Sequence, residues 1–98
     1  MTLAKVTAVL QTPLFKKTVK KLKPNQKKQR GAAIKRLMAK PTLGDLKKGD
    51  LAFLRVYKFK MSKQLTLLGY SYDDGALTLE LIALATRENF YRDVKRRS

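Results

Sequence analysis

Lys58 and Lys60 are the residues whose type and spacing point most directly to chemistry. They stand two apart in segment 51–60, whose aromatic and branched side chains predict a β-strand. Residues two apart on a strand point to the same face, so the two ammonium groups are expected side by side. Clustered cations stabilise phosphate charge, and one lysine of such a pair can act as a base. The alternative is a pair of solvated lysines at an exposed strand end.

The 98-residue chain contains no Cys and no His. Their absence excludes disulfides, a thiolate nucleophile, a Cys- or His-based metal site and an imidazole general base. Without imidazole, a lysine can serve as a base and a tyrosine as an acid. The length predicts a single domain over residues 1–98, and the 44% hydrophobic content is that of a globular chain.

The charge predicts a polyanionic partner. The chain has 23 Lys and Arg against 7 Asp and Glu, a formal net charge of +16. The charge is uneven, because the first 44 residues hold 12 basic residues and no acidic one. Such a field destabilises a compact chain and is usually tolerated where it attracts nucleic acid. An anionic membrane surface and a merely soluble surface are the alternatives.

The first 13 residues do not form a signal peptide, because Lys5 interrupts the apolar run. The longest strictly apolar run, 81–85, is far too short to span a membrane. We therefore expect a cytoplasmic protein without a membrane partner.

The pattern of apolar residues predicts an α+β fold. We expect a strand (3–10), two helices (14–23 and 26–39), a loop (41–49), three strands (51–60, 64–72 and 76–85) and a short helix (88–96). Asp73-Asp74-Gly75 indicates a tight turn between the last two strands. The strand meander should be antiparallel, since its connections are too short for crossovers, and the helical hairpin should pack on it.

This order and four sequence segments resemble the RelE/ParE toxins of bacterial type II toxin–antitoxin systems. The segments are Thr12-Pro13-Leu14-Phe15-Lys16-Lys17 with Lys20-Lys21-Leu22, Gly49-Asp50-Leu51, Arg55-Val56-Tyr57-Lys58-Phe59-Lys60, and Glu88-Asn89-Phe90-Tyr91-Arg92-Asp93-Val94-Lys95-Arg96. The resemblance covers nearly the whole chain and implies a toxin that a cognate antitoxin neutralises. RelE-like members cut mRNA in the ribosomal A site without a metal or other cofactor, whereas ParE-like members poison DNA gyrase.

The resemblance also implies roles for individual residues. Tyr57-Lys58-Phe59-Lys60 looks like the stretch that carries the catalytic lysines of RelE-like enzymes. Tyr91 matches a C-terminal tyrosine near the scissile phosphate, where it would position or protonate. Its alternative role is to anchor the last helix in the core, which is the role we expect for Phe90.

Two positions depart from the RelE-like pattern. Related toxins often carry a histidine where this chain has Arg87, and an arginine cannot exchange protons near neutral pH. Arg87 would instead stabilise the charge of the phosphorane, or would pair with Glu88 where the last helix begins. A gapless extension from Tyr57 puts Leu67 where RelE-like enzymes have an arginine, so one phosphate ligand is missing. That absence favours the ParE-like alternative.

A second basic set is expected to bind rather than react. It comprises Lys16, Lys20, Lys23 and Lys27, which recur at about one-turn spacing on the helical hairpin. This stripe could face ribosomal RNA or an acidic antitoxin segment, or it could be a solvated helix surface. Arg55 is offset from the lysine pair by an odd number of residues and is a further candidate for antitoxin binding. A non-toxic nucleic-acid-binding module is the remaining alternative.

Overall fold

The computed structural model describes residues 6–49, 52–73 and 75–97, without the side chains of residues 93 and 95–97. The elements are β1 (Ala8–Gln11), α1 (Pro13–Lys20), α2 (Pro24–Ala39), β2 (Asp45–Leu46), β3 (Arg55–Met61), β4 (Gln64–Asp73), β5 (Thr78–Thr86) and α3 (Arg87–Arg97). The predicted α+β class is therefore confirmed. Residues 3–5 of the first expected strand and the expected strand start at residue 51 lie outside the described residues.

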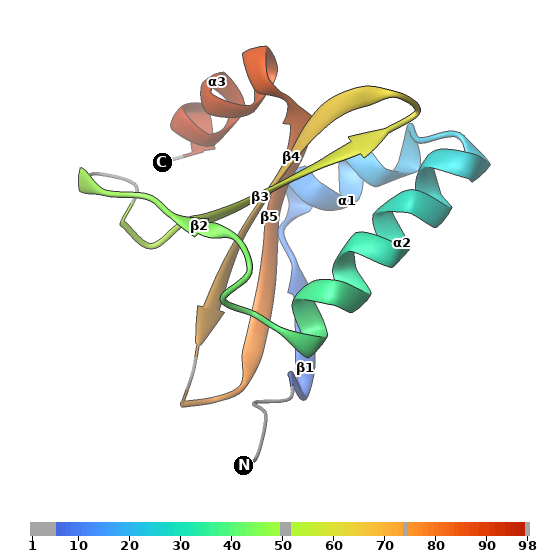
Figure 1. The fold of residues 1–98 in the computed structure, drawn as a ribbon. Coiled ribbons are helices and arrows are strands. Elements are labelled where there is room, and N and C mark those ends of the chain that lie inside the picture. Colours follow the sequence, from blue (N-terminus) through green and yellow to red (C-terminus); the bar gives the residue numbers. More distant parts are fainter. Residues whose placement is uncertain (1–5, 50–51, 74, 98) are drawn as a thin grey trace.

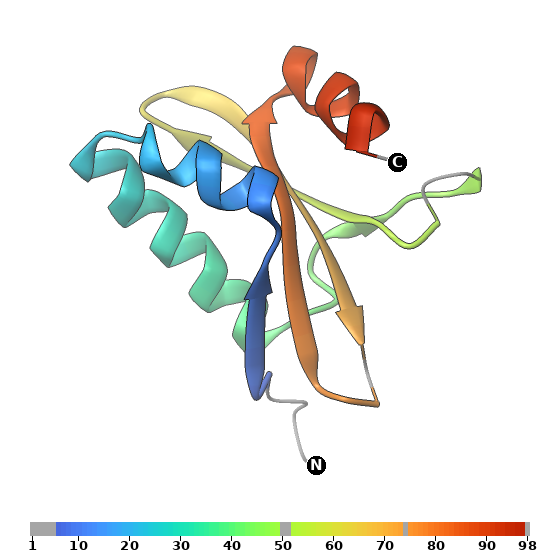
Figure 2. The same cartoon turned by 180° about the vertical axis from the view of Figure 1, so that it is seen from behind.

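The strands form one five-stranded sheet in the order β1-β5-β4-β3-β2. β3, β4 and β5 form the antiparallel meander that the sequence predicted. β1 pairs in parallel with β5, 70 residues later, through the register Ala8 to Thr78. The short β2 lies inside segment 41–49, for which the sequence predicted only a loop. α1 and α2 cover one face of the sheet, and α3 lies on the other (Figures 1 and 2).

Thr12 fixes where α1 begins and ties it to the sheet. Its side-chain oxygen accepts a hydrogen bond from the Phe15 amide at 3.2 Å, which caps the helix. The same hydroxyl donates to the Ile82 carbonyl of β5 at 2.7 Å. Pro13 takes the first helical position, where its missing N–H costs no hydrogen bond. α1 is therefore bound to β5 at its first turn.

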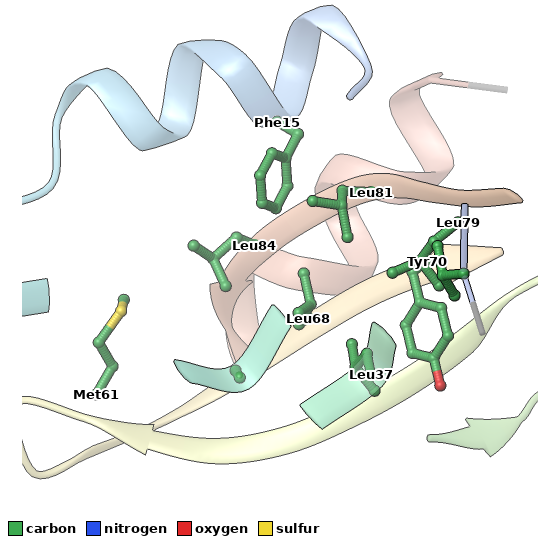
Figure 3. Close-up of a cluster of buried hydrophobic side chains, with 10 residues drawn as sticks. Phe15, Leu37, Met61, Leu68, Tyr70, Leu79, Leu81 and Leu84 are labelled. Atoms are coloured by element: carbon green, nitrogen blue, oxygen red, sulfur yellow. The ribbon is translucent and has the colours of Figure 1, made fainter. Parts of the chain in front are cut away.

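Each face of the sheet has its own core cluster. The first cluster lies under α1 and α2, and in it Phe15 reaches from α1 toward Leu81 and Leu84 of β5 (Figure 3). The second lies under α3 and includes Leu54, Leu67, Ile82, Ala83 and Phe90. A β-bulge interrupts the alternation of side chains along β5, because Gly69 pairs with Ala83 whereas Tyr70 pairs with Leu81. The extra residue directs Ile82 and Ala83 to the same face, under α3.

The two hairpin turns of the meander differ in how they are stabilised. At the turn the sequence predicted, the Asp73 carboxylate accepts from the amides of Gly75 and Ala76 at 3.0 and 3.1 Å. The turn between β3 and β4 consists of Ser62 and Lys63, both with positive φ, +53° and +67°. This backbone normally selects Asn-Gly, so the sequence carries no signal for it.

Candidate active site

An open hollow of about 730 Å³ lies where β4 begins, β5 ends and α3 starts. Its lining residues are Gln64, Leu65, Thr86, Arg87, Glu88 and Tyr91. α3 follows β5 without a loop, so the first turn of the helix stands directly at the end of the sheet. Residues four apart share one face of a helix, which is why Arg87 and Tyr91 both border the hollow. The structure therefore brings two of the predicted site residues together.

Phe90 fastens the beginning of α3 to the sheet. Its ring is fully buried and lies over Gly69 of β4, where an added Cβ would be 2.5 Å from the ring. The Phe90 and Tyr91 rings meet edge to face, with their centroids 5.1 Å apart. Phe90 is thus a core residue, as predicted, and the half-buried Tyr91 is left at the wall of the hollow.

Arg87 is exposed at the start of α3. The alternative role, an ion pair with Glu88, does not occur, because no Arg87 nitrogen lies within 4.0 Å of a described carboxylate. The next arginine along the helix behaves differently, since Arg92 donates to the Asn89 side chain at 2.8 Å. Arg87 thus has no ionic partner among the described side chains, and its guanidinium borders the hollow, where it could meet a phosphate group.

Lys58 and Lys60 lie on the face of β3 that α3 covers. They alternate in the same sense as Val56, which packs in the cluster under α3, and both side chains are exposed. Lys60 stands opposite Leu65 of β4, and Leu65 lines the hollow. Lys60 thus lies beside the site on the next strand, whereas Lys58 stands opposite the buried Leu67, and neither lysine lines the hollow itself. Lys60 also borders a smaller hollow of about 300 Å³ between α2 and β3.

Leu67 takes the position that the resemblance to RelE-like enzymes assigns to an arginine. It stands opposite Lys58 on β4 and is 1% exposed. Its side chain packs with Phe90 and Val94 under α3. An arginine here would have to bury its charge beneath the helix, at a large desolvation cost. The position therefore belongs to the core.

Arg55 lies on the opposite face from the lysine pair, as predicted, and holds the segment after α2. Its guanidinium donates to the carbonyls of Thr42 and Gly44 at 3.4 and 3.0 Å. The Tyr70 hydroxyl donates to the Pro41 carbonyl at 2.6 Å and accepts from the Gly44 amide at 2.9 Å. Burial raises the pKa of Tyr70, and the Gly44 hydrogen bond and the Arg55 charge oppose this rise. Arg55 therefore stabilises the segment that leads to β2, and its predicted role in binding the antitoxin stays a prediction.

The basic stripe lies apart from the hollow. Lys16 and Lys20 belong to α1, Lys23 precedes α2, and Lys27 lies in the first turn of α2. All four are exposed on the helical layer, and the sheet separates this layer from α3 (Figure 2). The protein therefore has two basic surfaces on opposite sides of its sheet.

Lys47 is a basic residue near the site that the sequence did not mark as a candidate. Its ammonium nitrogen lies 5.9 Å from the centroid of the Tyr91 ring. The two residues are 44 positions apart, and no local motif marks Lys47 among its many basic neighbours. Only the packing of segment 45–47 beside α3 makes it a candidate.

The described ranges contain no group of three or more His, Cys, Asp or Glu side chains that could hold a metal ion. Among the same residues, no helix is long and apolar enough to cross a membrane.

Solved structures of RelE toxins share this fold. A free E. coli RelE variant superposes with a TM-score of 0.68 at 15% identity, over 90% of this chain and 87% of that one. The toxin–antitoxin complexes RelBE of E. coli and RelBE2 of Mycobacterium tuberculosis each give 0.64, at 17% and 20% identity. These matches cover 80% and 82% of this chain, and 93% and 96% of the matched chains. At such identities the likeness extends to the fold alone.

Sequence comparison identifies the family. No curated protein matches the chain. The family model for the ParE-like toxin of type II bacterial toxin–antitoxin systems matches residues 9–95, which is most of the chain and includes the hollow and both basic surfaces. The protein therefore belongs to the ParE-like toxin family of type II bacterial toxin–antitoxin systems.

Proposed function

We propose that this toxin is a RelE-like endoribonuclease that cuts mRNA on the ribosome without a metal. One observation carries the proposal: Arg87 and Tyr91 border an open hollow on the same sheet face as Lys58 and Lys60. A cation of α3 thus borders a space that could receive a phosphate and its neighbouring base, and two further cations stand on β3 on the same face. The toxin would act in the cytoplasm, where translated mRNA is found.

The reaction needs only groups that this set provides. The RNA 2′-hydroxyl attacks the adjacent phosphorus, a P–O2′ bond forms, and the P–O5′ bond breaks to leave a cyclic phosphate and a 5′-hydroxyl. One lysine of the Lys58 and Lys60 pair takes the 2′ proton, and the other contacts the phosphate. Arg87 stabilises the dianionic phosphorane. Tyr91 positions the nucleotide or donates a proton to the leaving 5′ oxygen.

The helical layer would hold a larger polyanion. Lys16, Lys20, Lys23 and Lys27 present positive charge on the face opposite the hollow, where ribosomal RNA can lie while mRNA occupies the site. Three of the matching structures are complexes of a toxin with its antitoxin or with an antitoxin peptide. We propose that a cognate antitoxin likewise neutralises this chain and covers one of its basic surfaces.

Induced expression followed by mapping of mRNA 5′ ends tests the proposal. We expect translation to stop and new 5′ ends to appear within coding regions. Lys58→Ala with Lys60→Ala should restore growth and remove these ends. Lys28→Ala with Lys35→Ala is the matched control, because it removes the same charge from exposed positions of α2. Undiminished toxicity in the Lys58 and Lys60 double variant would sink the assignment.

A gyrase inhibitor without chemistry of its own is the second candidate. It is favoured by the buried Leu67, which replaces a phosphate ligand of RelE-like enzymes, and by the ParE-like description of the family. Inhibition of gyrase predicts a DNA-damage response and filamentous cells while mRNA stays intact. The same induction experiment therefore separates the two activities, and growth without arrest would point to a non-toxic binding module.

A further inference from the structure

The backbone of Lys47 is held rigidly at the edge of the sheet. Lys47 directly follows β2, which pairs with β3, and its amide donates a hydrogen bond to the Leu54 carbonyl at 2.9 Å. Upstream, Tyr70 and Arg55 bind the segment that leads to β2. Leu54 is fully buried in the cluster under α3. The start of the Lys47 side chain is therefore fixed relative to the helix that carries Tyr91.

From this fixed backbone position, the Lys47 side chain places its ammonium group over the Tyr91 ring. The ammonium nitrogen lies 5.9 Å from the ring centroid, within the distance at which a ring face attracts a cation. Lys47 is half-buried, whereas its neighbour Lys48 is exposed. Within the described part of the chain, no carboxylate lies within 4.0 Å of the Lys47 nitrogen. Among the residues that the structure describes, the aromatic ring is thus the partner for this charge.

We infer that Lys47 is a positioning residue for the proposed cleavage, because it holds the Tyr91 ring at the wall of the hollow. The inference rests on the proposed function. Tyr91 has two rotatable side-chain bonds, and its edge-to-face contact with Phe90 restrains one side of the ring. The Lys47 cation supplies an attraction from segment 45–47. Together the two contacts hold the Tyr91 ring in one rotamer, so its hydroxyl is already correctly oriented when the substrate binds.

This role differs from that of a phosphate ligand in what it changes. A phosphate ligand adds binding energy, so its loss raises the concentration at which cleavage saturates. A positioning residue acts after binding, so its loss lowers the saturating rate and leaves that concentration nearly unchanged. The role also depends on charge more than on shape, because the attraction is between a cation and a ring.

Single-turnover cleavage of mRNA on purified ribosomes distinguishes these roles. Lys47→Met keeps the length of the side chain and removes its charge. We expect it to lower the saturating rate about tenfold, with less than about a twofold change in the half-saturating concentration. Lys47→Arg should restore the rate to within about threefold, since arginine also binds aromatic faces. Lys48→Met, at the exposed neighbouring position, is the control and should leave both quantities unchanged. An unchanged saturating rate in Lys47→Met overturns the inference, whether or not binding weakens.

A measurement on the free toxin separates this inference from the proposed function. The ring protons of Tyr91 can be followed by NMR in protein with labelled tyrosine and assigned with Tyr91→Phe. We expect Lys47→Met to shift these signals and Lys48→Met to leave them in place. Unshifted Tyr91 signals in Lys47→Met overturn the contact, even where cleavage occurs. If the wild-type toxin cuts no mRNA while the Tyr91 signals respond to Lys47→Met, the proposed function fails, the contact stands, and the positioning role in cleavage is overturned.

Discussion

The absence of a Cβ at Gly69 leaves room for Phe90 of α3 to pack on the sheet, and Gly69→Ala tests whether this packing depends on it. The added Cβ would lie 2.5 and 2.8 Å from two carbons of the Phe90 ring and 3.2 Å from a methyl carbon of Leu54. Carbon atoms in contact normally stand about 3.5–4.0 Å apart, so the ring would have to move by more than half an ångström. Phe90 and Leu54 are both fully buried, and the space for such a shift is small.

The two opposing effects of this substitution have known sizes. Replacing a glycine in a strand normally stabilises a protein by about 0.5–1 kcal/mol, because alanine has less conformational freedom to lose. Overpacking a filled core costs about 1–3 kcal/mol, and a contact this short belongs at the upper end of that range. We therefore expect Gly69→Ala to lower the free energy of unfolding by about 2 kcal/mol.

Urea unfolding followed by circular dichroism measures this loss. Gly31→Ala is the matched control, because Gly31 lies within α2 and its added Cβ would meet nothing within 4 Å. That variant should gain about 0.5–1 kcal/mol, as a glycine replaced in a helix normally does. The same substitution thus has opposite signs at the two positions.

The reasoning can be refuted with Phe90→Ala as a background. Removing the ring empties the space that the new Cβ would enter, so Gly69→Ala should there be neutral or stabilising. The coupling between the two substitutions is expected to be about 2–3 kcal/mol. If Gly69→Ala leaves the wild-type stability unchanged, or if it costs as much without the Phe90 ring as with it, the close contact does not govern α3.

Two further predictions concern the buried tyrosine and the β3–β4 turn. Tyr70→Phe leaves the Pro41 carbonyl and the Gly44 amide without their partner, and should cost about 1–3 kcal/mol in urea unfolding. Burial raises the pKa of the Tyr70 hydroxyl, so its stabilising effect is complete below the unfolded pKa of about 10 and is lost as the pH rises through the folded pKa. The free energy of unfolding of the wild type should therefore fall above pH 10. In Tyr70→Phe this fall should be smaller, because the titrating hydroxyl is gone. Ser62→Asn with Lys63→Gly suits the positive φ angles of the turn and should stabilise the protein by about 1 kcal/mol, measured as a higher melting temperature. An unchanged or lower melting temperature would show that the present residues are not strained.

The sequence predicted what depends on neighbouring residues. The alternation of side chains from position 55 to 60 set Lys58 and Lys60 on one face and Arg55 on the other. Periodic apolar residues located the helical hairpin, and Asp73 with Gly75 marked the second turn of the meander. These features follow from short-range geometry and sterics, which the local residues specify completely.

The tertiary structure decided what depends on distant residues. The β3–β4 turn has no local signal, and its Ser62 amide is held by the side chain of Gln29 on α2 at 2.8 Å. Segment 41–49 was expected to be a loop, yet part of it becomes β2 because Arg55 and Tyr70 bind it along β3. Such contacts form only after the chain has folded, since they join elements far apart in the sequence.

The candidate site also has one part that the sequence predicted and another that depends on the tertiary structure. The sequence by itself limited the chemistry that is possible: without Cys and His there is no thiolate and no imidazole, and lysine, arginine and tyrosine became the candidates. The packing of the sheet decided which of these side chains meet. Phe90 fits over Gly69, and this contact leaves Tyr91 and Arg87 at the hollow. The fastening of segment 41–47 along β3 brings Lys47 to Tyr91, because a contact across 44 residues depends on the packed positions of both elements and not on their local sequences.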